Sequence, residues 1–459
     1  MDIISAIATG GASATAIGIV RISGEGCFAL CDRLFCPVNG GAFSAAAPRT
    51  MIYGSVLDQT GAILDHGLAV RFPGPHSSTA EDSAEFHCHG SPMVLQTLLS
   101  ALFSLGARQA GPGEFTKRAF LNGRLDLTQA EAVADLIDAE TAAAARNAAA
   151  QLSGTLRRDF EAVTDKLLEV SSRFYAVVDY PDEDIADIHP EEIAAALRSA
   201  DETLSRLLAT CERGRVLKNG VRTAIVGRPN AGKSSLLNAL AGYDRAIVTD
   251  IPGTTRDTVE ESVLCGGVLL RLIDTAGLRR TDDPVERLGV ERARQAVESA
   301  DLTLAVVDGS RLFSEEDQET LLLASRCPRW IFVLSKQDDP SGQGVGIRAL
   351  RDLPGPADTV EVSAVRKNGL RPLEDAVARL FPEGQAPAGE ILTSPRQQES
   401  ALRAQTAVRR GLEALCAGMT PDAVLSNVEE ALDALGELTG KTAREEIVSR
   451  IFERFCVGK

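Results

Sequence analysis

The 459-residue chain lacks an excess of basic charge, a long apolar run and closely paired cysteines. Its 48 Lys and Arg are outnumbered by 64 Asp and Glu, which gives a net charge of −16. Because nucleic-acid binders need a concentrated basic face, any nucleic-acid role must use a local patch or a partner. No stretch approaches 18 uninterrupted apolar residues, so we expect no membrane span, and Asp2 stands where a secretory leader would be basic. The nine cysteines form no CxxC pair, which indicates reduced thiols in a soluble, cytoplasmic protein.

The length is too great for one compact core, and the texture of the chain changes three times. Residues 1–118 contain short β-like runs, such as Ile17–Ile22 and Gly67–Phe72, between Gly-, Ser- and Pro-rich turns, which is typical of an α/β or β-rich domain. Residues 119–215 and 381–459 show helical patterns, and residues 216–380 alternate strand-like and helical stretches. We therefore predict four segments with these boundaries.

Three long helices are expected between residues 119 and 215. An apolar stripe from Leu156 to Val177 repeats at three- and four-residue steps, and Pro181 follows it. A second helix is predicted over Glu191–Arg213, and a third over the Ala-rich Thr128–Leu152. If these helices pack with those of residues 381–459, the helical domain is discontinuous and the α/β segment is an insertion in it.

A phosphate-binding loop opens the α/β segment. Gly227-Arg-Pro-Asn-Ala-Gly-Lys233-Ser234 matches GxxxxGK[ST], directly after an apolar strand and before a helix-like stretch at Ser235–Leu240. Backbone amides of such a loop turn toward phosphates, Lys233 reaches the outer ones, and Ser234 can bind Mg²⁺. The predicted strands of this segment, which form a mainly parallel sheet, are Arg222–Val226, Leu269–Ile273, Leu302–Val307, Ile331–Leu334 and Thr359–Val362.

Four further motifs follow in the order that a GTPase requires. Gly253-Thr-Thr-Arg-Asp257 offers hydroxyls to a metal, and Asp274-Thr-Ala-Gly277 ends a strand where its carboxylate can hold Mg²⁺ through water. Ser335-Lys-Gln-Asp338 offers a carboxylate to the two donors of the guanine edge, and Ser363-Ala364 supports the base. The predicted GTP-binding residues are Asn230, Ala231, Gly232, Lys233, Ser234, Ser235, Thr249, Asp250, Ile251, Pro252, Gly253, Thr254, Thr255, Asp274, Thr275, Ala276, Gly277, Ser335, Lys336, Asp338, Ser363 and Ala364.

Two residues depart from the usual GTPase pattern. The guanine-reading motif begins with Ser335 where Asn is usual, so we expect a lower nucleotide affinity with GTP still preferred over ATP. Leu278 stands where Ras-like proteins have the glutamine that orients the attacking water. An arginine from a second protein, a cation in the site or a nearby carboxylate can replace it. Glu286 is the candidate carboxylate, with a solvated helix-start residue as the alternative interpretation.

Two groups of sequence stretches carry a family resemblance: Gly227–Gly242, Ile247–Asp257 and Asp274–Arg279 in the GTPase segment, and Val20–Gly24, Pro112–Asn122, Leu125–Ala132 and Phe455-Cys-Val-Gly-Lys459 outside it. The first group resembles the TrmE/Era-like GTPases, and the second resembles the MnmE (TrmE) family of tRNA modification GTPases. The resemblance implies an N-terminal α/β folate-binding and dimerisation domain, a discontinuous helical domain and an inserted P-loop GTPase domain. It also implies work with the flavoprotein MnmG, which carries FAD, to add a carboxymethylaminomethyl-type group at C5 of the wobble uridine of certain tRNAs.

The resemblance further implies site residues and cofactors. A folate such as 5-formyl-tetrahydrofolate would contact Arg21, Glu85, Arg124 and Lys459. Mg²⁺ would bind Ser234 and Thr255, and K⁺ would bind near Asn230, Thr249, Ile251 and Thr254. Glu286 would then assist hydrolysis when two GTPase domains approach each other.

Cys456 and the surroundings of the GTPase segment leave alternatives open. Cys456 is either a nucleophile beside the one-carbon donor or a packed C-terminal cysteine. The alternative function is an Era-like ribosome-assembly GTPase, which would need a basic appended domain. The helical segments carry net charges of −9 and −3, so we expect the flavoprotein partner to hold most of the tRNA.

Overall fold

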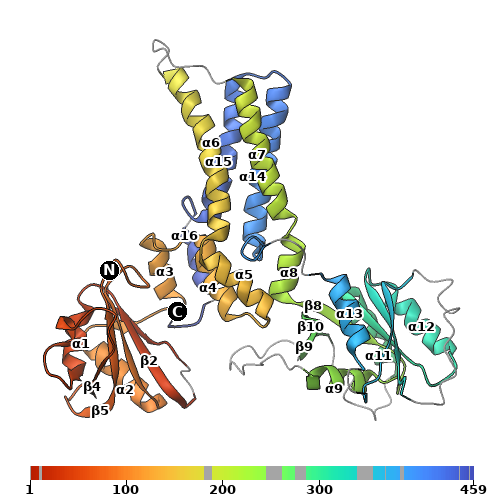
Figure 1. The fold of residues 1–459 in the computed structure, drawn as a ribbon, viewed down its shortest axis with the longest axis horizontal. Helices are drawn as coiled ribbons and strands as arrows, with labels where there is room; N and C mark the ends of the chain where they lie inside the picture. The colour runs from red at the N-terminus through yellow and green to blue at the C-terminus, as the bar shows by residue number, and fades with distance from the viewer. Residues whose placement is uncertain are drawn as a thin grey trace. The chain divides into compact units, whose positions relative to one another are not determined.

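The computed structural model describes residues 2–9, 13–179, 189–243, 261–273, 286–338, 355–366, 369–382, 387–443, 445–453 and 455–458. The chain divides into two compact units, and Figure 1 labels many of their elements. The first comprises Met1–Ile137, Ala148–Ser205 and Glu399–Lys459, and the second comprises Asp138–Asn147 and Arg206–Gln398. Each unit therefore joins segments that lie far apart in the sequence.

A seven-stranded sheet forms the N-terminal part of the first unit. Its spatial order is β3 (Phe35–Pro37), β4 (Ile52–Leu57), β5 (Ile63–Phe72), β6 (Ser83–Gly90), β2 (Thr15–Ser23), β1 (Ile4–Ile7) and β7 (Arg108–Gln109). All neighbours pair antiparallel except β1 and β7. Alternation along β2 and β6 places Val20, Ile22 and Phe86 in a core with helices α1 (Cys27–Leu34) and α2 (Pro92–Ser104). The two strands predicted from sequence here are confirmed within β2 and β5.

The helices of the first unit come from both sides of the GTPase segment. They are α3 (Glu114–Leu121), α4 (Leu127–Ile137), α6 (Thr155–Asp179), α15 (Pro421–Thr439) and α16 (Glu445–Phe452), together with most of α7 (Pro190–Leu208) and α14 (Pro395–Cys416) and the second half of α5 (Ala142–Leu152). Helix α6 packs against α15 (Figure 1). Arg409 Nε of α14 donates to Asp201 Oδ1 of α7 at 2.7 Å. The discontinuous helical domain predicted from the sequence is thereby confirmed.

Two of the predicted helices are each divided in two. Thr128–Leu152 forms α4 and α5, because residues 138–141 separate them and Thr141 Oγ1 accepts a hydrogen bond from Ala144 N at the start of α5. Glu191–Arg213 forms nearly all of α7 and the start of α8 (Cys211–Asn219). Thr210 Oγ1 donates to Leu207 O at 2.6 Å, and this side-chain bond competes with helix continuation. The single-helix predictions were wrong because apolar spacing alone does not reveal these local caps.

The second unit is built on a six-stranded sheet. Its spatial order is β13 (Asp358–Glu361), β12 (Trp330–Ser335), β11 (Leu302–Asp308), β8 (Val221–Val226), β10 (Val268–Leu272) and β9 (Glu261–Cys265). The pairing is parallel except between β9 and β10, and β9 was absent from the sequence prediction. The five predicted strands and the helix after the phosphate-binding loop, α9 (Lys233–Tyr243), are confirmed.

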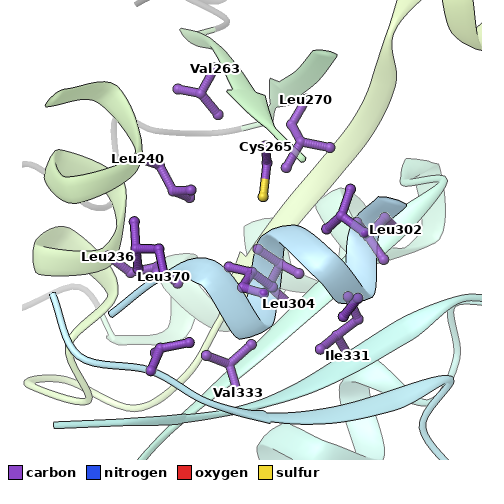
Figure 2. Close-up of a cluster of buried hydrophobic side chains, with 14 of the residues drawn as sticks. Leu236, Leu240, Val263, Cys265, Leu270, Leu302, Leu304, Ile331, Val333 and Leu370 are labelled. Atoms are coloured by element: carbon purple, nitrogen blue, oxygen red, sulfur yellow. The ribbon is translucent and has the colours of Figure 1, made fainter. Parts of the chain in front are cut away.

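Helices cover both faces of this sheet, so its central strand β11 is buried throughout. Alternate residues of β11 enter two cores: Leu302, Leu304 and Val306 pack with α9 and α13 (Arg371–Leu380). Ala305 and Val307 pack with α11 (Glu286–Ser299) and α12 (Glu315–Ala324). Figure 2 shows the first core, where Leu236 and Leu240 lie among side chains from the strands. Among the described helices, none combines the length and apolarity needed to cross a bilayer.

Candidate functional site

The phosphate-binding loop lies between the end of β8 at Val226 and the start of α9 at Lys233. Gly232 has φ +99°, and a Cβ on this residue would lie 3.1 Å from Ser335 Oγ. A Cβ on Gly227 would lie 2.5 Å from Val306 O, so both glycines of the motif permit close backbone packing. Lys233 Nζ donates to Gly227 O at 2.5 Å and to Arg228 O at 2.8 Å. Burial lowers the pKa of Lys233. The loop thus holds its lysine ammonium within its own backbone, at the N-terminus of a helix that favours anions.

The guanine-reading loop is bound to the phosphate-binding loop by two consecutive residues. Ser335, 5% exposed, donates from Oγ to Ala231 O at 2.5 Å and also lies 3.1 Å from Val307 O. Lys336 Nζ donates to Asn230 O at 2.9 Å. Ser335 therefore connects the two loops from the position where GTPases usually have Asn.

Asp338 and Ser363, which the sequence analysis both assigned to the guanine base, lie in direct contact. Ser363 Oγ donates to Asp338 Oδ1 at 2.7 Å and accepts from Arg366 N at 3.1 Å. This pair orients the Asp338 carboxylate at the carboxyl end of the sheet, with Ala364 next in the chain. An oriented carboxylate can accept the two donors of a guanine edge, a pattern that adenine does not present.

The remaining GTPase residues cannot be placed in the same way. Asp338 and the residues up to Ser235 of the first loop are described, but a second group lies outside the described residues: Thr249, Asp250, Ile251, Pro252, Gly253, Thr254, Thr255, Asp274, Thr275, Ala276, Gly277 and Leu278. Glu286 is the first residue of α11, and the orientation of its side chain is not described. The roles assigned to these residues stay predictions.

Two of the predicted metal-binding residues, Asn230 and Ser234, lie among the described residues. Asn230 and Ser234 offer side-chain oxygens, which suit the hard cations K⁺ and Mg²⁺, and both lie on the phosphate-binding loop. Across the described residues, no group of three or more His, Cys, Asp or Glu side chains could hold a metal ion. His87 and His89 share one strand face, while Cys88 points into the core. His87 contacts the carboxylate of Glu85, and His89 contacts that of Asp65.

A second polar site lies on the outer face of the N-terminal sheet. The antiparallel register of β2 and β6 pairs Arg21 with Glu85, and Arg21 Nε donates to Glu85 Oε1 at 2.9 Å. Arg21 Nη1 also donates to Gly458 O at 3.4 Å, and its guanidinium lies 5.6 Å from the centre of the Phe115 ring. The structure thus joins Arg21 and Glu85 to the residue that precedes Lys459, which itself lies outside the described residues.

His87 also belongs to this polar site, although the sequence analysis did not assign it there. Its Nε2 lies 3.2 Å from Glu85 Oε2, so Glu85 contacts Arg21 with one oxygen and His87 with the other. The two-residue spacing of Glu85 and His87 on one strand was the available signal. Arg124 is exposed on the turn between α3 and α4, and its backbone N donates to Ala119 O.

Cys456 is exposed in the C-terminal segment. Its carbonyl accepts a hydrogen bond from Gly113 N at 3.2 Å, next to a β-bridge between Pro112 and Val457. The segment is thereby joined to the start of α3, on the same unit as Arg21. The choice between a nucleophilic and a packing role for this thiol stays a prediction.

Comparisons with known proteins cover the whole chain. The family described as "GTP-binding protein TrmE N-terminus" matches residues 3–124, and the family described as "MnmE helical domain" matches residues 127–456. A "tRNA modification GTPase MnmE" of Roseiflexus sp. (strain RS-1) is 44% identical and covers 100% of this chain and 99% of that protein. One of the same name from Thermoanaerobacter sp. (strain X514) is 41% identical with the same shares.

Among solved structures, the G domain of the T. maritima FeoB iron transporter is 26% identical, with a TM-score of 0.25; it matches 35% of this chain and 97% of that chain. The two family matches include the segments on both sides of the GTPase segment, which does not favour the ribosome-assembly alternative. With the phosphate-binding and guanine-reading loops in contact, and with relatives above 40% identity along the full length, the chain belongs to the MnmE (TrmE) family of tRNA modification GTPases.

Proposed function

We propose that this GTPase acts with the flavoprotein MnmG to add a carboxymethylaminomethyl-type group at C5 of the wobble uridine of certain tRNAs. Membership of the family makes the chain a GTP hydrolase of tRNA modification. One observation supports the proposed wobble-uridine reaction with MnmG. Both flanking regions, as well as the GTPase segment, match relatives that carry the name "tRNA modification GTPase MnmE".

Nucleoside analysis of tRNA tests this proposal directly. Cells that lack the protein are expected to lose the C5 modification at the wobble uridine and to regain it when the wild-type chain is supplied. A Lys233→Ala chain, which loses the phosphate-contacting ammonium, is expected to leave the modification absent. Unchanged wobble uridines in the deletion strain would refute the assignment.

GTP is proposed to bind between the two connected loops, with Asp338 reading the base, Lys233 contacting the outer phosphates and Mg²⁺ on Ser234 and Thr255. K⁺ near Asn230, Thr249, Ile251 and Thr254 would supply the positive charge that an arginine finger brings elsewhere, and Glu286 would orient water. The support is the oxygen chemistry of Asn230 and Ser234 and the absence of a glutamine at Leu278. Turnover is expected to rise in K⁺ compared with Na⁺ at equal ionic strength, and equal rates would contradict the K⁺ site.

A folate ligand such as 5-formyl-tetrahydrofolate is proposed for the Arg21–Glu85 site, with Arg124 and Lys459 contributing. The pair is partly buried, with side chains 26% and 18% exposed, and it presents a cation and an acceptor side by side. These groups can pair with the amide and amino groups of a pterin and with a carboxylate. Calorimetric titration of the full chain with 5-formyl-tetrahydrofolate is expected to lose about tenfold in affinity in Glu85→Gln, because a charged hydrogen bond is lost. The exposed Glu25→Gln is the matched control, and equal affinities would count against the site.

A homodimer formed through the N-terminal domains is proposed from the exposed side chains of the same sheet. Tyr53, Leu68 and His87 form one cross-strand row, since the register pairs Tyr53 with Leu68 and Leu68 with His87. Tyr53 is 55% exposed and Leu68 is 36% exposed, so the row offers apolar area to a second copy. Sedimentation of the full chain and of Leu68→Glu is expected to show a dimer that weakens in the variant.

The remaining partners follow from charge and chemistry. MnmG with its FAD is proposed to hold most of the tRNA, because the acidic excess lies on the helical segments of this chain. A cytoplasmic location is proposed, and the nine cysteines, all free, are consistent with it.

A further inference from the structure

Asp308 ends the central strand β11 and is 2% exposed. Its Oδ2 accepts a hydrogen bond from Lys336 Nζ at 2.6 Å, and its Oδ1 accepts from Ser310 N at 3.0 Å and from Ser310 Oγ at 2.6 Å. Arg311 Nε lies 3.6 Å from Oδ2. Burial alone would raise the pKa of Asp308, but the bonds from Lys336 and Ser310 outweigh it and lower the pKa. The carboxylate is therefore charged in a site that water hardly reaches.

Lys336 connects this carboxylate to the phosphate-binding loop. The same Nζ that donates to Asp308 also donates to Asn230 O at 2.9 Å. Lys336 and Asn230 have φ values of +58° and +63°, and both are non-glycine residues in the left-handed region. Such a backbone persists only where surrounding contacts determine it, and the ammonium bridge joins the two residues that adopt it.

The parallel sheet explains why Asp308 is available for this contact. The register pairs Asp308 with Ser335 across β11 and β12, so the carboxylate emerges beside the first residue of the guanine-reading loop. Gly309 N donates to Ser335 O at 3.0 Å, and a Cβ on Gly309 would lie 2.3 Å from Gln337 Nε2. The end of β11 and the guanine-reading loop are thus in close contact at Gly309.

We propose that Asp308 is a positioning residue for guanine-nucleotide binding: it holds Lys336 so that the guanine-reading loop and the phosphate-binding loop keep one relative placement. A nucleotide must contact Asp338 with its base and Lys233 with its phosphates at the same time. Because the two loops are already held in place, nucleotide binding loses less conformational entropy. The inference rests on the assignment of these two loops to GTP, and it adds a residue outside the GTPase motifs.

The test compares Asp308→Asn with Asp301→Asn, which changes a carboxylate just before the opposite end of the same strand. Asp301 precedes β11, pairs with Arg215 at 3.1 Å and accepts a hydrogen bond from Arg222 N at 3.0 Å. Asp301→Asn therefore removes a charge of the same kind from the same unit without touching Lys336. The measurements are calorimetric affinity for GDP, KM and kcat for GTP, and the circular dichroism melting curve of each full chain.

Asp308→Asn is expected to weaken GDP binding about tenfold and to raise KM for GTP by a similar factor, with kcat changed less than threefold, because one charge-assisted hydrogen bond is lost. Asp301→Asn is expected to leave the GDP affinity within twofold of the wild type. Lys336→Met tests the link from its other end, since its side chain is 37% exposed and tolerates substitution without opening the core. The double variant is expected to bind no more weakly than the weaker single variant, because both changes remove one interaction.

Equal GDP affinity in wild type and Asp308→Asn would overturn the inference, as would full additivity of the Asp308 and Lys336 substitutions. A lower melting temperature with unchanged GDP affinity would show a purely structural role and would also overturn it. If the wild-type chain itself failed to bind GDP, the proposed nucleotide site would be wrong, which separates that failure from failure of the Asp308 proposal.

Discussion

Replacing Ser335 with alanine tests how the guanine-reading loop is held when its usual Asn is absent. The substitution removes only the hydroxyl that donates to Ala231 O at 2.5 Å and lies 3.1 Å from Val307 O. The hydroxyl has one proton and donates one hydrogen bond at a time, so the substitution removes one donated hydrogen bond. Because the residue is 5% exposed, water has little access to the carbonyl that loses its donor.

The size of the effect follows from that burial. Leaving a buried acceptor without its donor costs about 1–3 kcal/mol, and one or two kcal/mol corresponds to a factor of roughly 5–30 in an equilibrium. The bond joins the loop proposed to read the base to the loop proposed to contact the phosphates. We therefore expect its loss to lower the affinity for the nucleotide. Ser335→Ala should bind GDP about tenfold more weakly than the wild type, and ATP should remain a poor competitor because Asp338 is unchanged.

The assay is calorimetric titration of the full chain with GDP, followed by competition with ATP. Ser325→Ala is the matched control, since its hydroxyl donates to Leu322 O at the exposed end of α12 in the same unit. GDP affinity of Ser335→Ala within twofold of the wild type would refute the reasoning. Equal competition by ATP and GDP in the wild type would refute the base preference as well.

Three further predictions concern stability and reactivity. Leu304→Ala, at a fully buried position of β11, is expected to lower the free energy of unfolding by about 2–5 kcal/mol in urea titrations, whereas Leu312→Ala, at a 71% exposed position, should change it by less than about 0.5 kcal/mol. Burial alone would raise the pKa of Glu114, but hydrogen bonds from Arg108 and Gly111 N lower the pKa to about 2, so its stabilising contribution is present above the ordinary pKa of 4.5 and is lost as the pH falls toward 2. Acid unfolding of Glu114→Gln should therefore depend less on pH in this range, and an identical acid transition would contradict this. A maleimide is expected to label the exposed thiols of Cys36, Cys416 and Cys456 first. The thiols of Cys27, Cys88 and Cys265 should react later, because burial raises the pKa of each to about 12. Mass spectrometry of partly labelled protein measures this order.

Much of the GTPase segment was predictable because its signals are local. Five strands were located from short apolar runs, and the phosphate-binding loop from glycine and lysine spacing at a strand end. Strand β9 was missed because an edge strand that pairs antiparallel carries a weaker apolar run than a central one. The break at Thr210 was missed because its cause is one side-chain hydrogen bond within an otherwise regular apolar pattern.

The N-terminal polar site was only partly predictable. Arg21 and Glu85 came from family resemblance, and their direct pairing required the register of β2 and β6. The contact of Arg21 with Gly458 joins residues 437 positions apart, which no local pattern encodes. The contact between His87 and Glu85 was not predicted, because it depends on how the two side chains are oriented on their shared strand face.

The amino-acid sequence alone determined the class of this protein and the chemistry of its main site, because a phosphate-binding loop and a guanine-reading loop are short segments whose function follows from residue type and spacing. Only the tertiary structure decided how those loops are held together. Ser335 and Lys336 contact the phosphate-binding loop, and Asp308 binds Lys336, because parallel strands end at the same edge of one sheet. Packing in three dimensions, rather than spacing along the chain, selects which buried donors and acceptors become partners.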